Sequence, residues 1–301
     1  MQRPPNVDFF IIAGPTASGK SHLAIELAKV WDGEIINADS MQVYKDLSIL
    51  TARPQPHEEI VPHHLYGVLE PHESGSAAWW VEQTCITIND CMTRGRFPIV
   101  VGGTGFYLHA LTTGLSPVPD IDPVIREQVR NLSIEHVNDF ADFVYNLDPL
   151  TRERIRPTDI QRLARALEVF LQTGISIIIW HGKARPPLSY HYNYVVIEPE
   201  RDHLYDVINK RFQFMVENGA IEEVKKLMQL GLSPNLPIMR AIGVPELTAY
   251  LKGDLSLEKT IEQAQKNTRR YAKRQMTWFR HQVDKKIVIY KSDMATLMKE
   301  F

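Results

Sequence analysis

The sequence predicts an α/β fold with a parallel sheet and a helical insertion. Three observations support this prediction. Short apolar runs alternate with stretches of helical periodicity, which is typical of strand–helix–strand units. The first of these runs enters a glycine-rich loop that is followed at once by a helical pattern. A long central stretch between prolines is rich in helix formers but has no clear buried strand.

The glycine-rich loop reads Gly-Pro-Thr-Ala-Ser-Gly-Lys-Ser over residues 14–21. It follows the apolar run 9–13 and precedes a helical pattern over 22–31, the context that a phosphate-binding loop requires. Glycines let successive N–H groups face one concavity, and the helix N-terminus and Lys20 add positive charge. The loop therefore predicts a P-loop NTPase-like core. Its expected ligands to a diphosphate or triphosphate are Gly14, Pro15, Thr16, Ala17, Ser18, Gly19, Lys20 and Ser21, and Ser21 is the candidate Mg²⁺ ligand.

Composition is that of an ordinary soluble globular protein. The chain has 301 residues, of which 44% are hydrophobic and 23% charged, so one large domain or two are expected. No apolar run is long enough to cross a bilayer, and no signal-type segment precedes the first predicted strand. Cys85 and Cys91 are unsuited to a bridge because they lie six apart in a predicted helix. A cytoplasmic protein without a membrane partner is expected.

Two further predicted strands end in candidate catalytic groups. The run 34–39 ends at Asp39, and the run 97–101 is followed by Gly-Gly-Thr-Gly, which includes Thr104. Carboxyl ends of parallel strands share one edge of a sheet, so both residues are expected to face the crevice of Lys20. The alternatives are that Asp39 is a helix N-cap, and that Thr104 caps the next helix after a tight glycine turn.

Residues 51–76 are rich in proline and histidine. Clustered histidines suggest a metal site, but no regular ligand spacing with a nearby carboxylate is evident. A loop with structural histidines is the preferred interpretation.

Prolines at 117, 119 and 123 mark a predicted boundary. We expect a core domain over 1–118 and 191–301, and a helical insertion over 119–190. Within the insertion, Thr158 and Gln161 resemble a capping box in front of a helix. After it, the core is expected to continue with a strand at 194–197, helices at 202–217 and 220–230, and a last strand at 286–290.

A long basic helix is predicted over 258–281. Between Ile261 and Arg280 it has one acidic residue, Glu262, and six basic ones: Lys266, Arg269, Arg270, Lys273, Arg274 and Arg280. Basic side chains interleaved with aromatic ones suit nucleic acid, although a solvated helix face is the alternative. Arg240, next to a glycine-bearing turn, is a candidate phosphate ligand; its alternative is a surface ion pair.

These motifs together resemble the tRNA dimethylallyltransferases, also called tRNA isopentenyltransferases, of the bacterial type. The resemblance extends over about residues 8–281. Besides the phosphate loop it rests on Ala-Asp-Ser-Met-Gln-Val-Tyr at 38–44, His-His-Leu at 63–65, Val-Gly-Gly-Thr-Gly at 101–105, Arg-Ala-Ile-Gly at 240–243 and Thr-Arg-Arg-Tyr-Ala-Lys-Arg-Gln-Met-Thr-Trp-Phe at 268–279. The phosphate loop alone is shared by many nucleotide-binding enzymes, but the ordered set is specific. The chain departs from the family pattern at Leu50, Val244 and Pro245.

The resemblance implies a reaction. A dimethylallyl group is transferred from dimethylallyl diphosphate to N6 of adenosine 37, next to the anticodon of tRNAs that read codons starting with U. N6-isopentenyladenosine and diphosphate are the products. By this analogy Asp39 is the general base, and Lys20, Ser21 through Mg²⁺, Thr104 and Arg240 stabilise the leaving diphosphate. Arg126 is implied to assist at the active site.

The resemblance also implies the partners. The insertion would grip the anticodon stem-loop, and the chain is expected to act as a monomer. Implied tRNA contacts are Asp39, Ser40, Met41, Gln42, Gln161, Arg162, Leu163, Ala164, Arg165, Arg270, Lys273 and Arg274. Three alternatives remain: a small-molecule kinase, a prenyltransferase of free adenine nucleotides, and a non-catalytic RNA-binding module. The first two leave the insertion and the basic helix without a role, and the third leaves Asp39 and Thr104 without one.

Overall fold

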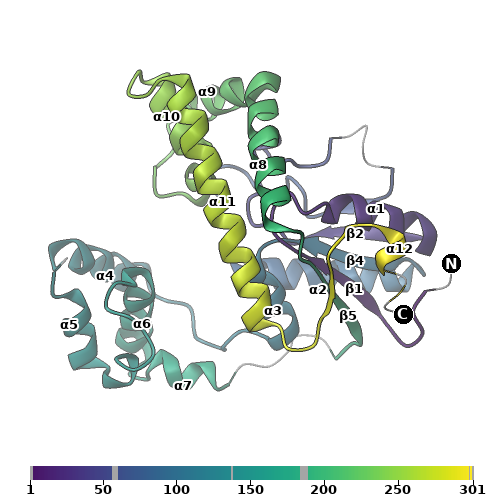
Figure 1. Cartoon of the computed structure of the whole chain (residues 1–301). Coiled ribbons are helices and arrows are strands. Elements are labelled where there is room, and N and C mark those ends of the chain that lie inside the picture. The colour runs from purple at the N-terminus through teal and green to yellow at the C-terminus, as the bar shows by residue number, and fades with distance from the viewer. Residues whose placement is uncertain (1–2, 56–59, 137, 184–188, 298, 300–301) are drawn as a thin grey trace. The chain divides into compact units, whose positions relative to one another are not determined.

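The structure is a computed structural model that describes residues 3–55, 60–136, 138–183, 189–297 and 299. The chain divides into two compact units (Figure 1). The core unit comprises Met1–Leu111 and Leu188–Phe301, and the insertion unit comprises Thr112–Pro187. The insertion unit therefore begins before the predicted boundary at 119. The reason is that the proline-rich segment before 119 packs on this unit, with Val118 partly buried against its hydrophobic core.

The core unit is built on a six-stranded parallel sheet of order β3-β2-β4-β1-β5-β6. The strands are β1 (Phe9–Ala13), β2 (Gly33–Asn37), β3 (His63–His64), β4 (Phe97–Gly102), β5 (Tyr192–Ile197) and β6 (Ile287–Ile289). β1, β2 and β4 are buried along their whole length. This explains the continuous apolar sequences of β1 and β4, whereas β2 also buries Glu34 and Asn37. The prediction of an α/β fold with a parallel sheet is confirmed.

β3 lies within the segment that was predicted to be a loop, so that prediction is wrong at residues 63–64. This edge strand pairs only two residues with β2, Ile35 with His63 and Ile36 with His64. Two residues are too few to produce a recognisable strand pattern.

Helices cover the sheet and extend beyond it in the core unit. Their bounds are α1 (Lys20–Trp31), α2 (Ala77–Thr93), α3 (Gly105–Thr113), α8 (Arg201–Met215), α9 (Ile221–Gln229), α10 (Val244–Leu251), α11 (Leu257–Gln282) and α12 (Met294–Leu297). α8 and α11 lie side by side (Figure 1). One hydrophobic core lies between the sheet and α1, and a second joins α8, α9, α10 and α11. The second core fixes α11 by one face and leaves its basic face exposed.

The described elements of the insertion unit are helical. They are α4 (Pro123–Glu135), α5 (Phe140–Leu147), a 3₁₀ turn (Pro149–Thr151), α6 (Ile160–Thr173) and α7 (Ile177–His181). Val129, Phe140 and Leu163 are buried in a core of their own. The predicted capping box at Thr158 is wrong, because Asp159 is the N-cap of α6. Its carboxylate accepts the N–H of Arg162 at 3.2 Å, the third helical position, which a carboxylate at the N-cap reaches directly.

Candidate active site

The phosphate loop joins β1 to α1 at the carboxyl edge of the sheet. Gly19 is the N-cap of α1 and adopts a left-handed conformation with φ of 83°, which favours glycine. A Cβ at Gly19 would also lie 2.2 Å from the hydroxyl of Ser292. Lys20 and Ser21 follow in the first turn of the helix. The N-terminus of α1 thus faces the same loop as its lysine, an arrangement that favours a phosphate.

Lys20 is held in the loop, where its Nζ donates to the carbonyl of Pro15 at 3.2 Å. Burial lowers the pKa of Lys20 to about 8, the Asp39 carboxylate opposes this shift, and Arg211 adds to it. An arriving diphosphate would restore the preference for the charged form, because opposite charges stabilise each other at low dielectric.

Arg211 on α8 is a site residue that the sequence reasoning missed. It donates through Nη2 to the hydroxyl of Thr16 in the phosphate loop at 2.6 Å. Burial lowers its pKa, and Asp39 raises it. The only local signal was an arginine in a predicted helix, which would ordinarily be a surface residue. Arg211 adds a second cation beside Lys20.

The ends of β2 and β4 bring Asp39 and Thr104 together. The N–H of Ser40 donates to Oγ1 of Thr104 at 3.0 Å, and the N–H of Thr104 donates to the carbonyl of Ala38 at 3.1 Å. The Asp39 carboxylate accepts the N–H of Met41 at 2.9 Å. No α-helix starts at Asp39, so the helix N-cap alternative is wrong. The turn instead fixes the carboxylate near Lys20 and Arg211, with which it interacts electrostatically.

A tyrosine on α11 completes this part of the site. Burial raises the pKa of Tyr271, and the Asp39 charge raises it further, while hydrogen bonds with Thr104 and Gln275 oppose the shift. Tyr271 therefore stays a neutral phenol near neutral pH. Sequence reasoning noted Tyr271 only as an aromatic residue in a basic helix.

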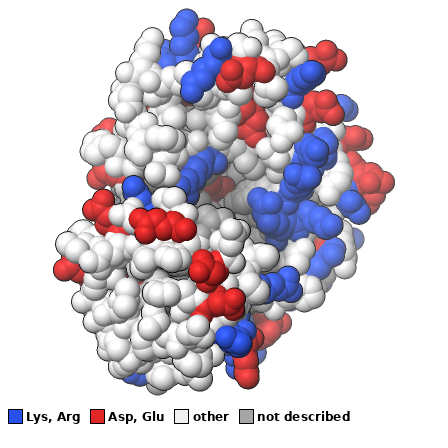
Figure 2. Space-filling view, turned by 90° about the vertical axis from the view of Figure 1, so that its left-hand side faces the viewer, with Lys and Arg blue, Asp and Glu red and all other residues white. Residues whose placement is uncertain are grey.

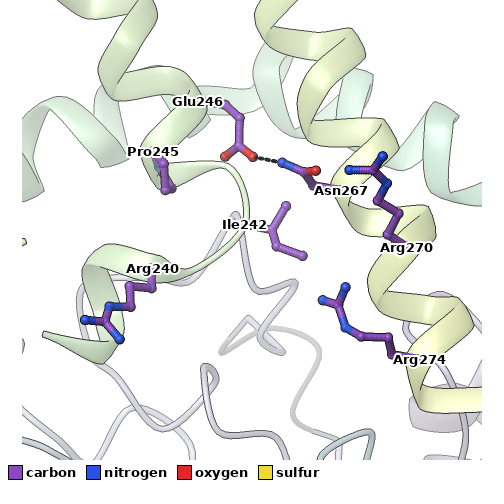
Figure 3. Close-up of a pocket in the computed structure, with 7 residues that line it drawn as sticks. All are labelled: Arg240, Ile242, Pro245, Glu246, Asn267, Arg270 and Arg274. Atoms are coloured by element: carbon purple, nitrogen blue, oxygen red, sulfur yellow. Dashed lines mark hydrogen bonds between the residues drawn. The ribbon is translucent and has the colours of Figure 1, made fainter. Parts of the chain in front are cut away.

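A separate pocket in the core unit gathers three arginines (Figure 3). Arg270 and Arg274 lie on α11 on one side of the pocket, and Arg240 lies across from them on a 3₁₀ turn at Pro237–Arg240, with its guanidinium pointing away from α11. The pocket also contains Glu246, but its carboxylate accepts from the Gly243 N–H at 2.8 Å and from the Asn267 amide at 2.7 Å. The three guanidinium groups make no ion pair within the described residues. Arg240 instead donates through Nη2 to the side-chain oxygen of Asn235 at 3.2 Å, and the pocket suits an anion.

The basic residues of α11 fall into two groups. Arg269 donates to Asn209 and Arg280 pairs with Glu198, so both are used within the fold. The others have exposed side chains and no ion pair in the described part of the chain; they are Lys259, Lys266, Arg270, Lys273 and Arg274. Figure 2 shows one large patch of Lys and Arg side chains on the face it presents, with further Lys and Arg side chains scattered among acidic ones. Exposed side chains without ion pairs are also what a solvated helix face has, so the nucleic-acid role of this face stays a prediction.

The predicted tRNA contacts of the insertion unit lie at the start of α6. Gln161, Arg162 and Arg165 are exposed there, whereas Leu163 is fully buried in the core of the unit. The side chain of Leu163 therefore supports the helix and cannot reach RNA. Arg126 is exposed on α4 of the same unit.

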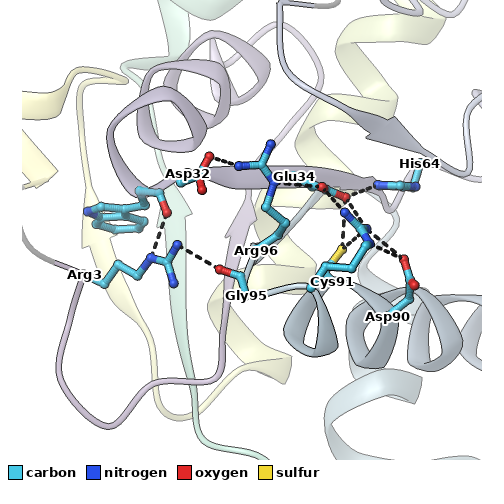
Figure 4. A network of polar contacts seen from close by, with 10 residues as sticks. Arg3, Asp32, Glu34, His64, Asp90, Cys91, Gly95 and Arg96 are labelled. Carbon is cyan, nitrogen blue, oxygen red and sulfur yellow. Dashed lines mark hydrogen bonds and ion pairs between the residues drawn. The ribbon is translucent and has the colours of Figure 1, made fainter.

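Glu34, His64 and Cys91 form a cluster of the residue types that bind metals (Figure 4). Glu34 is 1% exposed, and Arg94 donates to both of its oxygens, one at 2.7 Å. Its pKa is lowered to about 2, mainly by that hydrogen bond. Burial raises the pKa of the Cys91 thiol to about 12. The Arg94 guanidinium thus occupies both carboxylate oxygens that a metal ion would need. The Nε2 of His64 contacts Glu34 at 2.7 Å, which fits the predicted structural role of the histidines.

Two of the departures from the family pattern lie together in the second hydrophobic core. A Cβ at Gly243 would meet Leu50 at 2.6 Å, and Val244 is fully buried next to it. Pro245 lines the arginine pocket. The departures at Leu50 and Val244 thus change packing beside the pocket and remove none of its guanidinium groups.

Comparison with known proteins identifies the family. The model of the IPP transferase family matches residues 42–282, and that of the isopentenyl transferase family matches residues 7–66. The chain belongs to the IPP transferase family. It is 46% identical over 277 residues to the tRNA dimethylallyltransferase of Azorhizobium caulinodans, an alignment that covers 91% of this chain and 89% of that protein. The predicted family and its bacterial relatives are therefore confirmed.

Solved structures of the family agree with this assignment. The full-length tRNA isopentenylpyrophosphate transferase of Bacillus halodurans is 35% identical, with a TM-score of 0.69 over 97% of this chain and 93% of that one. A eukaryotic dimethylallyltransferase captured acting on tRNA is 28% identical, with a TM-score of 0.80 over 97% of this chain and 77% of that one. Among the described residues, no helix is both long and apolar enough to cross a membrane.

Proposed function

We propose that this chain transfers a dimethylallyl group from dimethylallyl diphosphate to N6 of adenosine 37, next to the anticodon of tRNAs that read codons starting with U. The main observation is the juxtaposition of Asp39 and Thr104 beside a phosphate loop with two cations near it, Lys20 at the start of α1 and Arg211 on α8. A carboxylate base beside a diphosphate site is what this transfer needs. Family membership makes the same reaction the first choice.

In the proposed step, N6 of the adenine attacks C1 of the dimethylallyl group. The C–N bond forms as the C1–O bond to diphosphate breaks, and diphosphate leaves with the electron pair. Asp39 takes the N6 proton, which becomes acidic only as the new bond forms. Lys20, Arg211 and Thr104 stabilise the negative charge that develops on the leaving group. Arg240 is proposed to add to this stabilisation.

The loop also suits Mg²⁺. The hydroxyl of Ser21 is exposed in the first turn of α1 and has no hydrogen-bond partner among the described residues. A neutral hydroxyl is the kind of oxygen ligand that Mg²⁺ takes together with substrate phosphates and water. When bound, the ion would neutralise charge on the diphosphate. Ser21 would hold the ion, and Lys20 would bind the diphosphate through its positive charge.

For the nucleic-acid partner we propose the anticodon stem-loop of tRNA. The unpaired cations Arg270, Lys273 and Arg274 would contact RNA phosphates. Residues 39–42 would lie next to the target base, and the exposed residues of 161–165 would contact the stem-loop. Arg126 is proposed to assist near the active site. The protein is proposed to act in the cytoplasm as a monomer.

A transfer assay tests the proposal. The protein is mixed with Mg²⁺, labelled dimethylallyl diphosphate and unmodified tRNA that has adenosines at positions 36 and 37, with AMP and ATP in parallel reactions. Label on tRNA alone is expected. Label on AMP or ATP would instead indicate a prenyltransferase of free nucleotides. No label, with ATP consumed, would favour the kinase alternative.

A further inference from the structure

We propose that Gln275 on α11 is a positioning residue that sets the spacing between the phosphate loop and the Thr104 turn. The inference rests on the proposed function. The side chain of Gln275 does not lie on the exposed basic face of α11, because it is buried, with 5% exposure. It points to the strand ends instead, where it joins two segments that are far apart in the sequence.

Both ends of the Gln275 amide are used. Its Oε1 accepts the N–H of Thr16 at 2.9 Å, and its Nε2 donates to the carbonyl of Gly103 at 2.8 Å. Thr16 N–H needs an acceptor and the Gly103 carbonyl needs a donor, so the orientation of the amide is fixed by its partners. A Cβ at Gly103 would lie 2.2 Å from Nε2. The amide therefore fills the space that a side chain at 103 would occupy.

These two hydrogen bonds of Gln275, called the Gln275 bridge, are linked to both the diphosphate site and the proposed base through one further contact each. The Thr16 hydroxyl accepts from Arg211 at 2.6 Å. Gly103 directly precedes Thr104, whose hydroxyl accepts the Ser40 N–H beside Asp39 at 3.0 Å. One buried amide thus ties the end of β1 to the end of β4 and, through Thr104, to the end of β2. The phosphate loop would hold the donor, whereas Asp39 would meet the acceptor.

Loss of the bridge should slow the chemical step more than it weakens RNA binding. A displacement of reacting groups by about 1 Å can lower the rate about 10²-fold. Phosphate contacts on the exposed face of α11 do not depend on the Gln275 amide. A residue that merely stabilised the helix would instead lower stability without a specific effect on the transfer rate.

The first test compares Gln275→Met with Gln265→Met. Gln265 lies on the same helix, where its Nε2 donates to the carbonyl of Asn209 on α8 at 3.0 Å, so it is a matched bridge elsewhere. Single-turnover transfer should be about 10²-fold slower in Q275M and within about twofold of the parent in Q265M. The dissociation constant for tRNA should stay within about twofold in both variants. Thermal unfolding of both variants measures any general loss of stability.

The second test uses Gln275→Glu and the pH. A neutral carboxylic acid has one donor and one acceptor and can replace both amide contacts, whereas an ionised carboxylate would face the Gly103 carbonyl without a proton. The transfer rate of Q275E relative to the parent should therefore rise as the pH falls from about 8 to about 6. Tyr271 on α11, Arg211 on α8 and Asp39 after β2 are the titratable or charged groups nearest to this bridge. They are present in both proteins, so the ratio removes their shared contribution.

A Q275M transfer rate within about twofold of the parent would overturn the inference, as would equal losses in Q275M and Q265M. A Q275E ratio that does not change with pH would also contradict it. Binding of inorganic diphosphate separates this inference from the proposed function. If the parent transferred no label to tRNA, the reaction would be wrong, yet Q275M should still bind diphosphate about tenfold more weakly than the parent.

Discussion

The strand-end site and the arginine pocket differ in how their polar groups are used. At the strand ends, Thr16, Asp39 and Thr104 each have a partner within the fold. In the pocket, Arg270 and Arg274 make no ion pair in the described part of the chain, and its one carboxylate, Glu246, is held by Gly243 and Asn267. A site with fixed geometry suits chemistry, because preorganised groups need no rearrangement in the transition state. Cations without partners suit the binding of a polyanion, because release of counterions favours association.

The difference between the strand-end site and the arginine pocket leads to a general expectation. Variants at the strand ends should lower the transfer rate with little change in tRNA affinity, and variants on the exposed face of α11 should do the reverse. A strand-end variant that weakened tRNA binding alone would break the distinction.

The largest effect is expected for Asp39→Ala. Removal of the base should lower single-turnover transfer by about 10³-fold, because general bases contribute about 10²- to 10⁴-fold. The dissociation constant for tRNA, measured by filter binding, should stay near that of the parent. Asp39→Asn is the matched control, since it keeps the shape of the side chain but cannot take a proton. A rate near that of the parent in either variant would show that the base is another group.

Thr104→Ala should have the next largest effect. The variant loses a hydroxyl that is proposed to stabilise the leaving diphosphate and that accepts the Ser40 N–H. A loss of about 10²-fold in single-turnover rate is expected, the usual size for one charge-stabilising donor. Thr104→Ser keeps the hydroxyl and should retain most of the rate. An unchanged rate in Thr104→Ala would remove Thr104 from the mechanism.

These predictions use residues that local sequence patterns could identify, and the rest of the site shows the limit of such patterns. Asp39 and Thr104 follow apolar strands directly, so their place at one sheet edge follows from parallel topology. Gln275 and Thr16 are 259 residues apart, and Arg211 and Thr16 are 195 apart. No periodicity links such pairs, because their contact depends on how α8 and α11 pack in the folded chain.

Boundaries show the same limit on a smaller scale. The two residues of β3 have no strand pattern of their own and become a strand only because β2 offers an unpaired edge. The N-cap of α6 was predicted at Thr158 but lies at Asp159, because both residues are good N-caps and the sequence pattern does not separate neighbouring positions. By contrast, α11 was predicted almost to its ends, since long amphipathic helices have the clearest periodicity.

Lys20 should produce a moderate dependence of diphosphate affinity on pH. Its pKa in the free protein is lowered to about 8, so the charged fraction falls as the pH rises through that value. Affinity for inorganic diphosphate, measured by calorimetry, should therefore decrease about tenfold between pH 8 and 9.5. Lys20→Arg keeps its charge over this range and should show a flatter profile. An equally steep decline in Lys20→Arg would assign the titration to another group.

The smallest effect, and the sharpest test of the pocket, is expected for Arg274→Ala. The side chain lies over the ring of Tyr271 with its guanidinium carbon 5.6 Å from the centroid, and it lines the pocket with Arg240 and Arg270. Loss of one phosphate contact should weaken tRNA binding a few-fold and lower the slope of log K against log salt by about 1. Arg280→Ala is the matched control, since Arg280 is paired with Glu198 on the same helix and should leave the slope unchanged. Equal slopes in the parent and both variants would mean that the exposed face of α11 does not meet the RNA backbone. The cations on this face of α11 would then differ from the groups of the strand-end site in having no ion pair, but they would have no role in RNA binding.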